Sequence, residues 1–157
     1  MTETTPMRVD HVGIAVASIE NAEPVLRAFG AEKLLEEFSE GFTWAYYRLG
    51  NGSRFELIEP TDEDSFLTDF LDQHGPGLHH VTLEVADIDR ATEGVEAAGL
   101  RVVDRADEDD WREAFVSPRN PTGTLFQLME YREGFAATRE FGSELFVGGR
   151  PLDGEPE

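Results

Sequence analysis

The chain contains an internal repeat, and this repeat limits the folds open to it. Residues 10–20 align with residues 79–89 at an offset of 79 − 10 = 69. Residues 55–59 align with residues 126–130 at an offset of 126 − 55 = 71, so the halves differ by a two-residue loop. Self-similarity of this kind predicts two copies of one supersecondary unit.

Hydrophobic alternation and helix-capping residues predict the same order of elements in both halves. In the first half we expect a helix over 18–29 and strands over 9–16, 32–38, 43–49 and 53–59. In the second half we expect a helix over 88–98 and strands over 80–85, 100–104, 113–116 and 124–131. Each half therefore reads β-α-β-β-β. Two such halves would pair their sheets and cover the outside with helices, an α+β architecture.

Helix caps and turns set the ends of these elements. Ser18 or Asn21 can cap the first helix, and Asn21 is favoured because it leaves Pro24 in the first turn, where proline is tolerated. Asp87 is the predicted cap of the second helix. Gly50-Asn51-Gly52 predicts a tight turn between two strands.

The chain divides into five segments. We expect a disordered lead-in over 1–7, a first module over 8–60, an acidic linker helix over 61–76, a second module over 77–131 and a C-terminal extension over 132–157. In the linker, Phe66, Phe70 and Leu71 are predicted to form one apolar stripe.

The composition restricts the partners and the compartment. Against 33 acidic residues there are 13 basic ones, a net charge of −20, so the surface repels nucleic acid. There is no cysteine, and no apolar run approaches the ~18 residues of a membrane-spanning helix. The N-terminus lacks an export signal, so we expect no membrane contact and a cytoplasmic location. The acid is spread along the chain, which favours a solvated, halophilic-type surface over a dedicated acidic interaction surface.

Repeat symmetry pairs four polar residues. His11 and His80 begin equivalent strands, and Glu56 and Gln127 lie in the middle of equivalent closing strands. Alternation sends their apolar neighbours to the other face, so these polar groups are forced inward, where they need partners. Two imidazoles, a carboxylate and an amide oxygen suit a divalent cation such as Mn, Fe, Co, Ni or Zn, and Mg less well. The alternative is a buried network of His, Glu and Gln with water.

Five segments of the chain form recognisable motifs: DHVGIAV (10–16), FELIEP (55–60), GPGLHHV (75–81), FVSPR (115–119) and GTLFQL (123–128). These motifs resemble the vicinal oxygen chelate superfamily, which has the glyoxalase and bleomycin-resistance fold. The resemblance covers residues 9–131, and within the superfamily it is closest to methylmalonyl-CoA epimerases. It implies paired modules in a cupped, eight-stranded mixed sheet with helices outside, usually in a homodimer. It also implies a metal held by His11, Glu56, His80 and Gln127.

Two departures separate this chain from the epimerase pattern. Those epimerases commonly have glutamine where this chain has Glu56 and glutamate where it has Gln127. Their catalytic glutamate on the second strand of the first half falls at Trp44, which cannot carry a proton.

The resemblance implies an isomerase that acts through an enolate on methylmalonyl-CoA or a similar acyl-CoA. Glu56 is the first candidate for the base and Glu84 the second, although Glu84 could instead orient a histidine. Arg119 is the candidate for the phosphates of CoA, and its other interpretation is a surface arginine that balances local acid. Two alternatives on the same fold are a glyoxalase I-type lyase or dioxygenase and a non-catalytic protein that sequesters a small molecule.

We predict that the protein becomes more stable in salt. Dissolved ions screen the repulsion among the excess carboxylates, so the melting temperature should rise between dilute buffer and molar KCl. A thermal melt across a KCl series measures this, and a melting temperature that falls over that range would contradict the solvated-surface interpretation.

Overall fold

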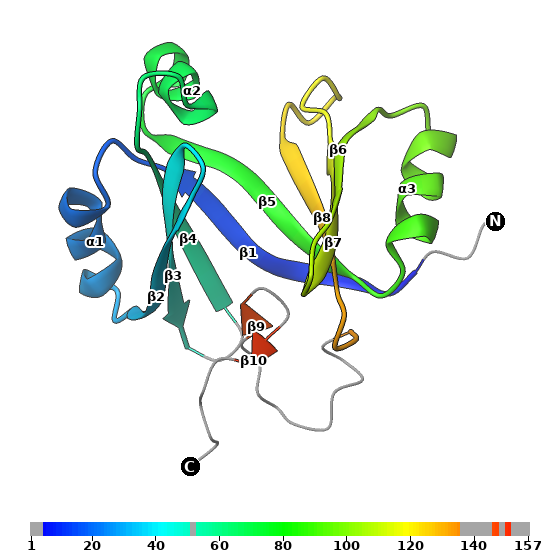
Figure 1. The fold of residues 1–157 in the computed structure, drawn as a ribbon, viewed down its shortest axis with the longest axis horizontal. Helices are drawn as coiled ribbons and strands as arrows, with labels where there is room; N and C mark the ends of the chain where they lie inside the picture. The colour runs from blue at the N-terminus through cyan, green and yellow to red at the C-terminus, as the bar shows by residue number, and fades with distance from the viewer. Residues whose placement is uncertain (1–4, 51–52, 136–145, 148–149, 152–157) are drawn as a thin grey trace. The chain divides into compact units, whose positions relative to one another are not determined.

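The eight long strands of the chain form one mixed sheet. The structure is a computed structural model and describes residues 5–50, 53–135, 146–147 and 150–151. The helices and strands, in chain order, are β1 (Met7–Ala15), α1 (Ile19–Ala28), β2 (Glu32–Ser39), β3 (Phe42–Leu49), β4 (Ser53–Pro60), α2 (Phe66–His74), β5 (Gly77–Val85), α3 (Ile88–Ala97), β6 (Val102–Asp107), β7 (Trp111–Val116), β8 (Leu125–Tyr131), β9 (Phe146–Val147) and β10 (Arg150–Pro151). The sheet order is β2-β3-β4-β1-β5-β8-β7-β6, and β9 and β10 form a separate two-stranded sheet (Figure 1).

The predicted repeat is confirmed as a repeat of structure. β1 and β4 pair in parallel, and β4, β3 and β2 continue as antiparallel neighbours. β5 and β8 likewise pair in parallel, followed by antiparallel β7 and β6. α1 and α3 occupy the same place in each half. The α+β class and the β-α-β-β-β order were therefore readable from the sequence.

The chain divides into two compact units, and the division runs through β1 and β5. One unit holds His11–His79, and the other holds Met1–Asp10 together with His80–Glu157. The start of β1 thus belongs with the second half, where the Ala86 amide donates to the Pro6 carbonyl at 2.9 Å. Within the predicted disordered lead-in over 1–7, Thr5 is buried and Met7 already begins β1, so order starts earlier than predicted. Residues 1–4 lie outside the described residues.

In the first half, α1 covers one face of the strands. Ile19 and Leu26 pack on Ala45, Tyr47 and Leu57 in a buried apolar cluster. This face is the one opposite to His11 and Glu56, because side chains alternate along a strand. The helix therefore closes the back of the sheet and leaves the polar side for other contacts.

The predicted cap of α1 was wrong. Ser18, and not Asn21, is the N-cap, and its hydroxyl accepts from the Asn21 amide at 3.2 Å. The Ile19 amide donates to the Glu59 carboxylate at 2.9 Å, so two N–H groups of the first turn are satisfied and Ile19 is buried. These contacts stabilise the earlier start and place Pro24 inside the helix.

α3 repeats this arrangement in the second half. Its predicted cap, Asp87, accepts from the Arg90 amide at 3.1 Å, and the Ile88 amide donates to Glu130 at 3.1 Å. Its apolar side packs on Ala114 and Leu128, on the face opposite to Gln127.

α2 lies between the two repeats, and Ser65 caps it. Leu67, Phe70 and Leu71 pack with Ala15 and Ile58. Phe66 is 52% exposed, but its ring lies 5.8 Å from the His79 ring, and the Phe70 ring lies 4.8 Å from the same ring. The two phenylalanines of the predicted stripe therefore share a side of the helix, and the fully buried Leu67 is the residue that the prediction left out. Among the described residues, no helix is both long and apolar enough to cross a membrane.

Strand boundaries differ from the predictions where the chain bulges. β6 extends to Asp107, beyond the predicted end at Asp104, because Asp104 adopts a positive φ of 51° and the pairing with β7 resumes after a register shift. Leu49 pairs with Ser53 at the end of the β3–β4 hairpin, whereas Asn51 and Gly52 of the predicted turn lie outside the described residues. So does most of the predicted extension over 132–157.

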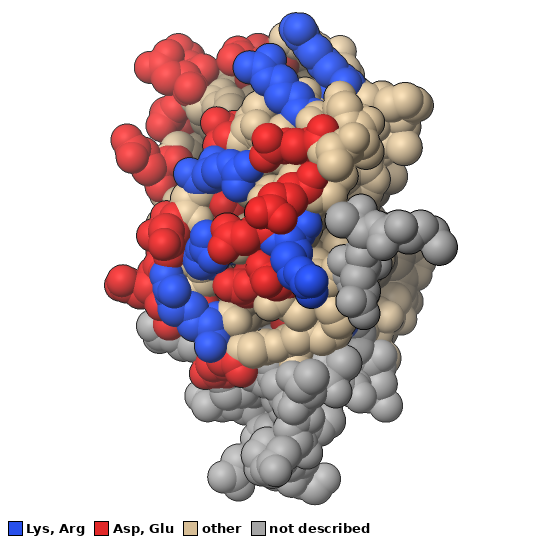
Figure 2. Space-filling view, turned by 90° about the vertical axis from the view of Figure 1, so that its right-hand side faces the viewer, with Lys and Arg blue, Asp and Glu red and all other residues tan. Residues whose placement is uncertain are grey.

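Acidic and basic side chains alternate on the side of the molecule that carries α3 (Figure 2). Asp89 in the first turn of α3 accepts two bonds from the Arg112 guanidinium of β7, at 3.0 and 3.2 Å. These bonds from Arg112 hold the pKa of Asp89 below its ordinary value of 3.8.

This shift predicts a pH-dependent contribution to stability. A carboxyl whose pKa is lower in the folded state stabilises the fold above the pKa of the unfolded chain, and it loses that contribution as the pH falls through the folded value. Asp89→Asn should therefore lower the melting temperature at neutral pH, and this difference should shrink at acidic pH, as the pH falls through the folded-state pKa below 3.8. The exposed Glu93 on the same helix provides the control, Glu93→Gln. A melting-temperature difference for Asp89→Asn that persists at the acidic pH would show that the ion pair is not its cause.

Candidate functional site

In the first half, three buried polar side chains lie on the sheet face that α1 does not cover. His11 comes from β1, Tyr46 from β3 and Glu56 from β4. The register sets Glu56 directly opposite Tyr46 on one side and beside Gly13 on the other, two residues from His11. Glu56 is directed to this face because its neighbours Phe55 and Leu57 pack toward α1.

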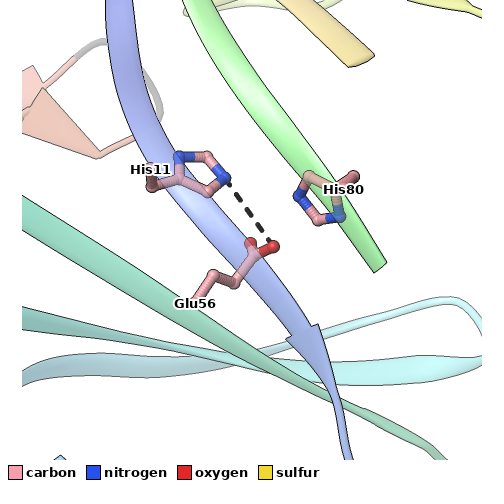
Figure 3. Close-up of side chains that lie close together, drawn as sticks. All are labelled: His11, Glu56 and His80. Carbon is pink, nitrogen blue, oxygen red and sulfur yellow. Dashed lines mark ion pairs between the residues drawn. The ribbon is translucent and has the colours of Figure 1, made fainter. Parts of the chain in front are cut away.

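The Nε2 atom of His11 is the point on which this group converges. It lies 3.7 Å from Glu56 Oε1 (Figure 3) and 3.3 Å from the Tyr46 hydroxyl. The Tyr46 ring meets the imidazole edge-on, with the centroids 4.9 Å apart. His11 is 1% exposed and Glu56 8%. The 3.7 Å separation is too long for a strong hydrogen bond, and it is close to the roughly 3.0–3.4 Å between two donors that each bind one ion at ~2.1 Å.

An aromatic and a cationic side chain, Trp44 and Arg54, lie beside Tyr46 in this group. Trp44 lies two residues from Tyr46 on β3, and its ring meets Tyr46 edge-on at 5.2 Å. The guanidinium carbon of Arg54 lies 6.0 Å from the centre of the Tyr46 ring, and Arg54 is only 4% exposed. A buried arginine on the strand that carries Glu56 is notable in a chain with so few cations.

The equivalent face of the second half carries a hydrogen-bonded chain across three strands. The Thr82 hydroxyl of β5 donates to Gln127 Oε1 of β8 at 2.6 Å, and Gln127 Nε2 donates to Glu113 Oε2 of β7 at 2.5 Å. His80 lies on the same face of β5 as Thr82 and is 7% exposed. The predicted inward face of this strand is thus buried.

Glu84 belongs to a second buried network in this half. Its carboxylate accepts from Arg8 Nε at 2.8 Å, and Arg8 also lies 3.3 Å from Asp10. Asp10 in turn accepts from the Tyr131 hydroxyl at 3.0 Å. Glu84 is 0% exposed, so its charge is balanced by Arg8 inside the protein.

Arg119 lies on an exposed loop between β7 and β8. The loop is shaped by Asn120, whose amide donates to the carbonyls of Ser117 and Thr124 at 2.8 and 3.0 Å. This places the arginine at the surface, where a charged ligand could reach it.

Sequence reasoning missed two residues of these groups, Tyr46 and Glu113. A signal for Tyr46 existed. Partners across the β3–β4 hairpin have residue numbers that sum to 49 + 53 = 102, so Glu56 must face residue 102 − 56 = 46. Glu113 required the register of β7 and β8, for which the sequence offers no comparably tight turn.

Known proteins give these observations a context. The chain is 34% identical over 131 residues to the uncharacterized protein YqjC of Bacillus subtilis, covering 78% of this chain and 91% of that protein. It is 32% identical over 129 residues to the ethylmalonyl-CoA/methylmalonyl-CoA epimerase of Cereibacter sphaeroides, covering 77% and 96%. Its structure is similar to that of a serine-to-threonine variant of Streptomyces coelicolor methylmalonyl-CoA epimerase in complex with 2-nitronate-propionyl-CoA. That similarity has a TM-score of 0.72 at 29% identity and covers 84% of this chain and 98% of the other.

Two β-α-β-β-β repeats that share one mixed sheet, each with buried polar residues opposite its helix, define a class of paired-module α+β proteins. The model of the Glyoxalase/Bleomycin resistance protein/Dioxygenase superfamily matches residues 10–115. The chain belongs to this family, and the predicted resemblance is confirmed.

The Arg8–Glu84 pair generates a stability prediction. Arg8→Met leaves a fully buried carboxylate without its cation and should lower the free energy of unfolding by about 3 kcal/mol. Urea denaturation measures this. Adding Glu84→Gln to the same chain should restore most of the loss, because the unpaired charge is then gone.

The control is the exposed Arg48–Glu32 pair, where Arg48→Met should cost under about 1 kcal/mol. If Arg8→Met cost no more than this control, Glu84 would have another charge partner.

Proposed function

We propose that this protein is a divalent-metal-dependent epimerase that acts through an enolate on an acyl-CoA, most similar to methylmalonyl-CoA epimerase. The observation that carries the proposal is the buried His11–Glu56 pair, together with a second buried histidine, His80, at the repeat-equivalent position. The relatives include epimerases of this substrate class.

The proposed metal ligands are His11, Glu56 and His80, the side chains drawn in Figure 3. Their donor set, two imidazoles and one carboxylate, fits Mn, Fe, Co, Ni or Zn better than Mg. Burial supports this assignment, because the three side chains are at most 8% exposed and water has little access to an ion held among them. Gln127 as a fourth ligand stays a prediction, and its amide already contacts Thr82 and Glu113.

A bound divalent ion would supply positive charge beside the oxygens of a carbonyl substrate. The side chains of the protein would position the metal ligands, exclude water and transfer the proton. The Tyr46 ring, which meets the imidazole edge-on, would hold the His11 ring in place, and Trp44 and Tyr46 would keep water away from the reacting carbon. Glu56 remains the first candidate for the base. Glu84 is less favoured than the sequence suggested, because accepting a proton would break its ion pair with Arg8.

Recognition of the CoA part is assigned to Arg119. Its exposed loop presents a guanidinium that can bind a phosphate through two bonds. In a chain of net charge −20, a local cation is needed to bring an anionic substrate to the surface. A homodimer and a cytoplasmic location stay predictions.

The test is deuterium incorporation at the α-carbon of methylmalonyl-CoA in heavy water, with metal content measured by elemental analysis. The wild-type protein should exchange this proton. Glu56→Gln should retain metal, because the amide oxygen can still bind it, and should lose exchange by about 10²-fold or more.

The control Glu37→Gln changes an exposed carboxylate on β2 and should leave exchange intact. Absence of exchange in the metal-loaded wild type would contradict the epimerase proposal. Turnover of a hemithioacetal in a parallel assay would instead assign a lyase of the glyoxalase type. Exchange that survives in Glu56→Gln would remove Glu56 from the role of base.

A further inference from the structure

Trp44 lies on the face of the first half that carries His11 and Glu56, next to Tyr46. We propose that the Trp44 ring contacts the alkyl group on the reacting carbon of the substrate and limits that group to a small one. Trp44 is then the residue that selects 2-alkylmalonyl thioesters of CoA by the size of their C2 substituent. This inference rests on the proposed function and names the substrates within that class that the site accepts.

A row of polar side chains crosses this face at the level of the proposed metal ligands. The β3–β4 pairing sets Tyr46 opposite Glu56, and the β1–β4 pairing sets Gly13 on the other side of Glu56. The Tyr46 hydroxyl and the Glu56 carboxylate both approach His11 Nε2, at 3.3 and 3.7 Å. Gly13 adds no side chain to this row, so its chemistry is that of the other three residues.

Two positions away, in the same direction on all three strands, the face becomes apolar. Trp44 pairs with Ile58, and Ile58 pairs with Ala15. A strand rises about 3.3 Å per residue, so this apolar row lies about 7 Å from the polar row. Helix α2 packs on the apolar row, because Leu67 forms a buried cluster with Ala15 and Ile58.

Trp44 is the side chain that joins the two rows. Its ring meets the Tyr46 ring edge-on at 5.2 Å, and the Tyr46 ring meets His11 edge-on at 4.9 Å. Ala15 and Ile58 are at most 2% exposed, whereas Trp44 is only partly buried. Of the three side chains in the apolar row, Trp44 is therefore the one that a bound molecule can touch.

The chemistry of a 2-alkylmalonyl group matches this change from polar to apolar. Its oxygens are polar and belong with the row that holds His11 and Glu56, whereas the alkyl group on the adjacent carbon is stabilised by contact with an apolar surface. Trp44 supplies that surface beside the polar row. An indole ring is rigid, so a longer alkyl chain has to displace it and disturb its packing on Tyr46 and on the cluster under α2.

The first experiment compares deuterium exchange at the α-carbon of methylmalonyl-CoA and butylmalonyl-CoA, with the metal-loaded full chain. The wild type should prefer the methyl substrate. Trp44→Ala should raise kcat/KM for the butyl substrate, relative to that for the methyl substrate, by about 10²-fold, because one methylene group in an apolar site changes this constant about 10-fold or more. Trp44→Phe, which keeps a smaller ring, should shift the ratio in the same direction by less.

The ratio separates specificity from folding. Both rates come from one preparation of each variant, so any loss of folded protein cancels. The control is Phe38→Ala on β2, which removes an aromatic ring that is 81% exposed and should leave the ratio at its wild-type value. Equal wild-type rates for the two substrates, or an unchanged ratio in Trp44→Ala, would overturn the assignment of Trp44. A wild-type protein that exchanges neither substrate would overturn the proposed function itself, which is a different outcome.

The second experiment detects the contact without catalysis. The chain has two tryptophans, Trp44 and Trp111, so Trp111→Phe leaves Trp44 as the fluorescent indole. Saturating methylmalonyl-CoA should shift the emission of this variant to shorter wavelength, because the alkyl group displaces water from the partly buried ring, and CoA without an acyl group should not. The emission of Trp44→Phe, which comes from Trp111, should shift less. Unshifted emission from Trp111→Phe that still exchanges methylmalonyl-CoA would contradict the contact.

Discussion

The structure depends on strands that are buried on both faces. One face of each half is apolar and packs on a helix, as Leu57 does under α1 and Leu128 does under α3. Because side chains alternate, the intervening residues are directed to the other face whatever their polarity. His11, Glu56, Thr82 and Glu84 are all buried there. A chain that places polar groups in such positions must provide partners for each of them, and those partners define the site.

The two halves have the same arrangement of strands but provide different partners for their buried polar side chains. In the first half, His11, Tyr46 and Glu56 converge on one nitrogen atom. In the second half, Thr82 and Glu113 hold Gln127 between them. The repeat supplies equivalent backbone positions, and different side chains at those positions give each half its own donors.

Much of the fold could be predicted because it follows from local rules. Alternation gave the strands, Asp87 gave the start of α3, and the repeat gave the order of elements. The failures occurred where a distant contact overrode a local preference. Ser18 caps α1 in place of Asn21 because Glu59 and the apolar core also stabilise the earlier start. In α2, the packing of Leu67 on Ala15 and Ile58 adds a buried residue that the predicted stripe did not contain.

The sequence by itself determined the class of fold and the face to which each candidate residue points, because both follow from periods of two and 3.6 residues and from the repeat. Only the tertiary structure decided which groups touch. Arg8 meets Glu84 across 76 positions, and Tyr131 meets Asp10 across 121. These pairings depend on the order of strands in the sheet and on their register, which no local periodicity encodes. For that reason Glu84 looked like a base in the sequence and is an ion-paired residue in the structure, while Glu113 went unnoticed until its strand was placed beside Gln127.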